Sequence, residues 1–149
     1  MPSNKPYLNS RDLGIDLDSK NESQLFRWLL ACLLYGKPIQ GIIAKRAYEK
    51  ITGNGITSLK KLVSTEWHTL VSILDEARYV RYDFSTAYKL LDVAKNLQQQ
   101  YGSVSNMLKK SGSLKNLKQN LLEFKGVGPV TVDIFVREIG PIWYKKPTS

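Results

Sequence analysis

The stretch from residue 121 to residue 136 constrains the fold more than any other part of the sequence. It contains two apolar segments joined by Gly-Val-Gly at residues 126–128. Two glycines one residue apart allow positive φ angles and the close approach of another backbone. Pro129 suits the first position of a helix, where its missing N–H would have no partner. The following apolar residues have the spacing of one buried helical face: Val132, Phe135, Val136 and Ile139. The sequence therefore predicts a helix, a tight hairpin and a second helix that ends at Gly140-Pro141.

This hairpin has one functional and one structural interpretation. A helix that starts at Pro129 presents free N–H groups with positive helix-dipole potential, and Lys125 lies just before the glycines, an arrangement that can hold a phosphate. The residues that this interpretation assigns to phosphate contact are Lys125, Gly126, Val127, Gly128, Pro129 and Thr131. The alternative is that Gly-Val-Gly is a sharp corner between helices and Lys125 an ordinary surface lysine.

The charge of the chain favours the functional interpretation. Its 149 residues are enough for one domain with a real core, and they hold 22 Lys and Arg against 13 Asp and Glu, a formal net charge of +9. Such an excess favours a polyanionic partner, with nucleic acid ahead of an acidic membrane surface. The alternative is that scattered lysines only keep a small helical domain soluble.

The single cysteine and single histidine exclude several kinds of chemistry. Cys32 cannot form a disulfide within the chain, and neither a Cys/His zinc site nor an iron–sulfur cluster can be built, so we expect no such cofactor. Cys32 falls on an apolar helical face, which predicts a buried, inert thiol. His68 follows Trp67 near a helix start and is interpreted as a structural histidine. The cysteine usage suits a reducing, intracellular setting, either cytoplasmic or in the nucleoid.

Membrane targeting is not expected. The first 20 residues are polar and contain no apolar stretch followed by small residues, so no signal peptide is predicted. The longest apolar run, residues 28–35, is much too short to span a bilayer. We expect no membrane partner.

Apolar periodicity predicts an all-α protein. Residues 1–21 are rich in Pro, Asn, Ser and Asp and are interpreted as an irregular N-terminal arm, and residues 22–149 as one helical domain. No segment shows the alternation of a strand. Short loops between short helices favour a compact orthogonal bundle. Helices are predicted over residues 22–35, 43–51, 58–63, 67–74, 87–97, 103–110, 114–124 and 129–139.

Aromatic residues beside cations occur in two further places. The loop at residues 77–83 contains Arg78-Tyr79-Val80-Arg81-Tyr82, and the tail contains Trp143-Tyr144. Each can stack on nucleic-acid bases, or its aromatic rings can pack inward against the core. For the loop both interpretations stay open, with Arg78 and Arg81 as candidate DNA contacts. For the tail we favour covering the core.

The segment Leu-Glu-Phe-Lys-Gly-Val-Gly-Pro-Val-Thr-Val at residues 122–132 resembles the helix-hairpin-helix Gly/Pro-Asp superfamily, the endonuclease III-like DNA glycosylases. The order of the helices is also similar over nearly the whole chain, although only the hairpin is specific. The resemblance implies that the hairpin N–H groups of residues 126–128 bind the DNA backbone. It also implies that hairpin carbonyls can share a monovalent cation with a phosphate. Lys125 stands where the family often has proline.

The chain departs from the family at its catalytic positions. The resemblance places a Schiff-base lysine two residues after the second hairpin glycine, where this chain has Val130, and a catalytic aspartate near Thr148. The cluster-binding cysteines that follow in endonuclease III are also missing. Asp133 is a weak substitute, four residues before Arg137 at ordinary ion-pair spacing, and Glu138 has no evident charged partner.

Three hypotheses follow from these features. The first is a DNA-binding protein on the glycosylase scaffold that grips phosphates without sequence preference and lacks complete glycosylase chemistry. The second is an active base excision repair enzyme that uses a non-standard acid such as Asp133 or a residue from a partner. The third is a helical protein-interaction module whose charge is incidental.

Overall fold

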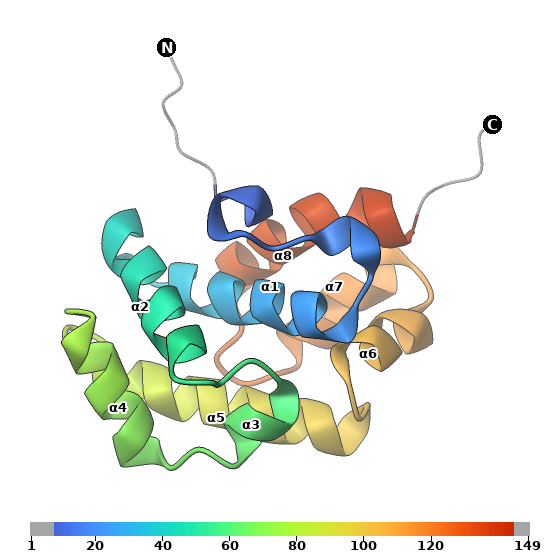
Figure 1. The fold of residues 1–149 in the computed structure, drawn as a ribbon. Helices are drawn as coiled ribbons and strands as arrows, with labels where there is room; N and C mark the ends of the chain where they lie inside the picture. The colour runs from blue at the N-terminus through green and yellow to red at the C-terminus, as the bar shows by residue number, and fades with distance from the viewer. Residues whose placement is uncertain (1–7, 145–149) are drawn as a thin grey trace.

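The computed structural model describes residues 8–144 of the chain, and these residues form helices and no strand. This confirms the predicted all-α class. Two short 3-10 helices precede the α-helices, and Figure 1 shows their arrangement. The elements are η1 (Ser10–Leu13), η2 (Leu17–Ser19), α1 (Glu22–Tyr35), α2 (Gly41–Gly53), α3 (Leu59–Val63), α4 (Trp67–Glu76), α5 (Asp83–Gln100), α6 (Val104–Ser111), α7 (Leu114–Leu122) and α8 (Pro129–Trp143).

The core is built around α1, which crosses the middle of the molecule and packs against α2, α5, α6 and α8 (Figure 1). Nine of its residues are buried, so α1 is apolar on nearly all sides, as expected for a central helix. The Trp28 side chain is fully buried, and its Nε1–H donates to the Phe135 carbonyl of α8 at 3.1 Å. Helices α3 and α4 pack on α5 below this layer.

Side-chain caps define the starts of three short helices. Ser58, Ser103 and Ser113 each accept a hydrogen bond from the backbone N–H three residues later, at the starts of α3, α6 and α7. These caps fix the first residue of each helix, which the spacing of apolar residues alone does not define. Positive φ angles at Gly102 and Gly112 turn the chain before α6 and between α6 and α7.

The described part of the N-terminal stretch differs from the predicted irregular arm. It forms η1 and η2, and Ile15 and Leu17 are buried in the core. The Ser10 backbone N–H donates to the Glu138 carboxylate of α8 at 2.9 Å, and the Ser10 hydroxyl donates to its other oxygen. Glu138 therefore holds this stretch on α8. Residues 1–7, which include Tyr7, lie outside the described residues.

The last helix also differs from the prediction, because α8 continues through Gly140 and Pro141 to Trp143. Proline removes one intrahelical hydrogen bond here but lies in the last turn, where the cost is smallest. The Tyr144 hydroxyl donates to the Leu108 carbonyl at 2.6 Å, and the Lys20 Nζ lies 5.4 Å from the Trp143 ring centroid. The aromatic pair thus covers the end of the core, which confirms the favoured interpretation of these two residues.

Candidate nucleic-acid interface

The predicted hairpin is formed by residues 123–128 between α7 and α8. Phe124 and Val127 are buried and anchor the turn, and the Val127 N–H donates to the Phe124 carbonyl at 3.0 Å. Gly126 has a φ of 92°, a left-handed conformation that favours glycine. Lys125 is exposed beside it. The apolar anchors therefore point inward, and the lysine lies on the solvent side.

The N-terminus of α8 has no side-chain cap. Gly128 is its N-cap in extended conformation, and Pro129 occupies the first turn. The first N–H groups of any helix lack intrahelical partners, and here those of Val130 and Thr131 remain after proline. The Thr131 side chain is buried, which leaves its backbone N–H as the group able to face a ligand. Val130 is 57% exposed at the same end.

The hairpin packs against the C-terminal end of α1. A Cβ on Gly36, the C-cap of α1, would overlap the Thr131 hydroxyl, so the two helices meet where only glycine fits. The Lys89 side chain of α5 lies under the hairpin, since a Cβ on Gly126 would be 2.9 Å from Lys89 Cγ. The Lys89 Nζ donates to the Leu33 carbonyl of α1 at 3.0 Å.

Lys89 is a buried cation. Desolvation by burial, with a smaller contribution from the Lys37 charge, lowers the pKa of Lys89 to about 8. Its ammonium satisfies one of the last carbonyls of α1, and its aliphatic stem supports Gly126. This residue was not predicted to belong to the site. Its sequence signal was a lysine on the apolar stripe of α5, three residues after buried Thr86 and four before buried Val93.

The loop between α4 and α5 meets the same end of α1. Tyr79 is fully buried, and its hydroxyl donates to the Leu34 carbonyl at 2.6 Å. Burial is the main cause that raises the pKa of Tyr79 to about 12. Of the two interpretations left open for this loop, inward packing therefore applies to Tyr79. Tyr82 is half-buried, and Val80 is 57% exposed.

Cations surround Tyr82. The Arg81 Cζ lies 5.7 Å and the Lys37 Nζ 5.1 Å from the Tyr82 ring centroid, which brings the α1–α2 loop beside the α4–α5 loop. Arg78 is exposed and has a φ of 71°, a left-handed conformation unusual for a side-chain-bearing residue. Three segments remote in sequence therefore meet around the end of α1: the α1–α2 loop, the α4–α5 loop and the hairpin.

Acidic side chains occur near the end of α4, at the start of α5 and along α8. Asp133 is exposed on α8, one turn after Pro129. A hydrogen bond with the Asp83 carboxylate is the main cause that raises the pKa of the Asp75 carboxyl, so two interacting acids lie near the end of α4 and at the start of α5. Glu138 is engaged by Ser10 at the far side of α8. Within residues 8–144, no group of three His, Cys, Asp or Glu residues is placed to hold a metal ion.

The two chemically distinctive single residues lie outside this interface. Cys32 is fully buried, and burial raises the pKa of its thiol well above the usual value, in agreement with an inert thiol. The His68 side chain is 74% exposed, and its Nε2 lies 3.1 Å from the Glu66 carboxylate. His68 is thus a surface residue and takes no part in the packing.

The fold is similar to that of a helical DNA glycosylase. The chain is similar to the crystal structure of the 3-methyladenine DNA glycosylase MagIII of H. pylori, which was solved bound to 1,N6-ethenoadenine. The TM-score is 0.61 at 20% sequence identity, over 85% of this chain and 59% of the glycosylase. This chain therefore spans about three fifths of that enzyme's length.

Other comparisons give no match: neither a protein-family model nor a curated protein sequence matches this chain. In the part of the chain that the structure describes, no helix combines the length and apolar character needed to cross a membrane.

Proposed function

We propose that this protein binds the DNA backbone without sequence preference, through the hairpin and the two loops beside it. The observation that carries this proposal is the convergence at one end of α1. The uncapped start of α8 lies there with exposed Lys125. Lys37 and Arg81 lie around Tyr82 in the adjoining loops. Helix N–H groups with nearby cations are suited to phosphate oxygens, and such contacts carry no base information.

The proposed division of roles follows the exposure of each residue. Lys125, Arg78 and Arg81 supply charge, and the N–H groups of Gly126, Gly128 and Thr131 supply directed hydrogen bonds. Val127 and Pro129 fix the turn that aims them. A monovalent cation shared with a phosphate is part of the same proposal. The Phe124 carbonyl already accepts a hydrogen bond from the Val127 N–H. The carbonyls of residues 125–127 are therefore the first candidates to bind this cation.

The fold shared with a 3-methyladenine DNA glycosylase supports a role connected with DNA repair. Base excision itself is a separate proposal, because Val130 cannot form a Schiff base and the Asp133 carboxyl is exposed on α8. Release of a damaged base by the purified protein, abolished by Asp133→Asn, would establish that activity.

The binding proposal is tested with labelled duplex DNA, by fluorescence anisotropy over a salt series. The wild type should bind with a strong salt dependence. Lys125→Gln should reduce the slope of log affinity against log salt by about one, the value for one phosphate contact. Lys109→Gln is the matched control, because Lys109 is exposed on α6. It should change neither the affinity for DNA nor the salt slope.

Two further results would redirect the interpretation. Binding that is weak and insensitive to salt, or equal in the wild type and Lys125→Gln, would make the hairpin a structural corner and favour the protein-interaction hypothesis. Preference for a duplex with an abasic-site analogue would favour the repair-enzyme hypothesis.

A further inference from the structure

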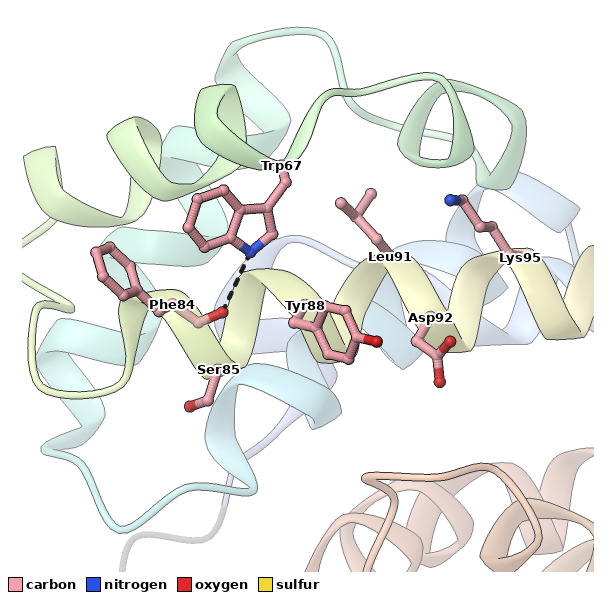
Figure 2. Close-up of a pocket in the computed structure, with 7 residues that line it drawn as sticks. All are labelled: Trp67, Phe84, Ser85, Tyr88, Leu91, Asp92 and Lys95. Carbon is pink, nitrogen blue, oxygen red and sulfur yellow. Dashed lines mark hydrogen bonds between the residues drawn. The ribbon is translucent and has the colours of Figure 1, made fainter.

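An aromatic groove lies on the outer face of α5, away from the core. Figure 2 shows that α4 contributes Trp67 and α5 contributes the other labelled side chains. The hollow has a volume of about 730 Å³. The residues that line it are Trp67, Phe84, Ser85, Tyr88, Leu91, Asp92 and Lys95. We refer to these residues as the α5 groove.

The three aromatic rings of the α5 groove are open to solvent. The exposed fractions of Trp67, Phe84 and Tyr88 are 39%, 61% and 63%. The Trp67 and Phe84 rings lie 5.2 Å apart at 53°, and the Trp67 Nε1–H donates to the Phe84 carbonyl at 3.4 Å. The indole is thus held in place before any ligand arrives, which lowers the entropic cost of stacking against it.

The dimensions of the groove suit a short single strand. Phe84, Tyr88, Leu91 and Lys95 recur at helical spacing along one face of α5. The twelve residues from Phe84 to Lys95 span about 16 Å at the rise of an α-helix. Nucleotides follow one another at about 3.4 Å along a stacked strand. The groove therefore has room for about five consecutive nucleotides.

The polar groups of the groove suit a nucleic acid better than an apolar peptide. The Lys95 ammonium lies at the end of the groove nearest α3, which packs on α5 and carries exposed Lys60 and Lys61 (Figure 2). These three cations can hold the phosphates of a strand whose bases stack on the rings. Asp92 and Ser85 line the other side, where their oxygens can accept hydrogen bonds from exocyclic amino groups of bases.

The groove and the hairpin both contact α5. Tyr88 directly precedes Lys89, whose stem supports Gly126 of the hairpin. A strand that leaves the hairpin can therefore reach the groove along one helix. We propose that the α5 groove binds unpaired bases of single-stranded DNA, which stack on Trp67, Phe84 and Tyr88. This inference rests on the proposed DNA-binding function and adds a second site with a different ligand structure.

The test compares two ligands and three proteins by fluorescence anisotropy: labelled oligothymidylate of eight nucleotides, and labelled duplex. The double variant Phe84→Leu, Tyr88→Leu keeps apolar volume but removes two rings. It should lose single-strand affinity by about tenfold or more, because each base–aromatic stack is worth roughly that factor. Its duplex affinity should stay within about twofold of the wild type. Lys125→Gln should show the reverse pattern.

Controls keep the result interpretable. Ile42→Ala, at a side chain that is 64% exposed on α2, should change neither affinity. Tyr88→Phe keeps the ring and should retain single-strand binding, and circular dichroism verifies the fold of each variant. Equal single-strand binding by the wild type and the double Leu variant would overturn the α5 groove site. So would wild-type self-association that this variant abolishes, because a second copy would then cover the groove.

The two proposals fail in different ways. Duplex binding without single-strand binding would remove the α5 groove proposal and leave the hairpin proposal standing. Ring-dependent single-strand binding with no duplex binding would remove the hairpin proposal and support the groove.

Discussion

The two hairpin glycines, Gly126 and Gly128, look equivalent in the sequence but differ in backbone conformation and surroundings. Gly126 combines a φ of 92° with a close approach to the Lys89 stem, whereas Gly128 has a φ of −109° and open space around its Cα. The strain of a left-handed alanine and the contact with Lys89 add together at the first position only.

We therefore predict that Gly126→Ala lowers the free energy of unfolding by about 1–3 kcal/mol. Gly128→Ala should change it by less than about 0.5 kcal/mol, the range of ordinary surface substitutions. Urea unfolding followed by circular dichroism measures both. Equal effects of the two substitutions would show that the hairpin does not hold Gly126 in the left-handed conformation.

Lys89 makes stability depend on pH. Its folded-state pKa, about 8, lies below the ordinary value of 10.5, so the unfolded chain binds more protons between these two values and stability rises with pH across that window. The gain for the wild type from pH 7 to pH 10 is at most about 3 kcal/mol. The cost of burying the charged Lys89 ammonium is fully present below pH 8.

The measurement is the difference in unfolding free energy between the wild type and Lys89→Met at several values between pH 7 and pH 10. Methionine keeps much of the stem under Gly126 but cannot titrate. The wild type should gain on the variant as pH rises. A constant difference would contradict a buried ammonium. The window stops at pH 10 because Tyr35, Tyr79 and Tyr144, each with a pKa raised to about 12, reverse the slope above it.

At the scale of single elements, α6 depends on a side chain from another helix. Both oxygens of the Glu22 carboxylate accept hydrogen bonds at 2.8 Å, one from the Val104 N–H and one from the Ser105 N–H. These N–H groups are at the start of α6, where the helix dipole also favours a negative charge. Glu22 is itself at the start of α1, so it joins two helix ends.

Glu22→Gln should therefore lower the free energy of unfolding by about 1–2 kcal/mol, because an amide offers one acceptor oxygen and no charge. Glu123→Gln, at an exposed residue that follows α7, is the control and should stay near zero. Thermal unfolding of both variants and the wild type at neutral pH measures the two effects. Similar melting temperatures for the two would show that the Glu22 cap is unimportant.

For the whole molecule, the described N-terminal stretch is held to α8 by the pair Ser10 and Glu138. Glu138→Ala should release this attachment and expose the backbone near Arg11. Limited trypsin digestion should then cut at Arg11 several times faster than in the wild type, since cleavage follows the population of the open form. Asp133→Ala, also on α8 but exposed, is the control. Equal cleavage rates would show that burial of Ile15 and Leu17 alone holds the stretch.

The sequence predicted the helices well and their ends less well. Serine caps and apolar periodicity are local signals, so the starts of α3, α6 and α7 followed from neighbouring residues alone. The continuation of α8 past Pro141 could not be predicted, because it depends on packing of Trp143 and Tyr144 against Lys20 and Leu108. The hairpin was found from its glycines, but its support was not, since Lys89 and Gly36 are remote in sequence.

Residue types and spacing by themselves determined that this chain is helical and basic, and that a tight Gly-Val-Gly turn joins two apolar helices near its C-terminal end. These signals act locally, through backbone conformation, helix capping and the helical periodicity of apolar residues. The tertiary structure alone decided which cations meet at the end of α1, that Tyr79 points inward, and that Trp67 joins Phe84 and Tyr88 in one groove. These outcomes depend on contacts between distant segments, and such contacts are set by packing of the whole core.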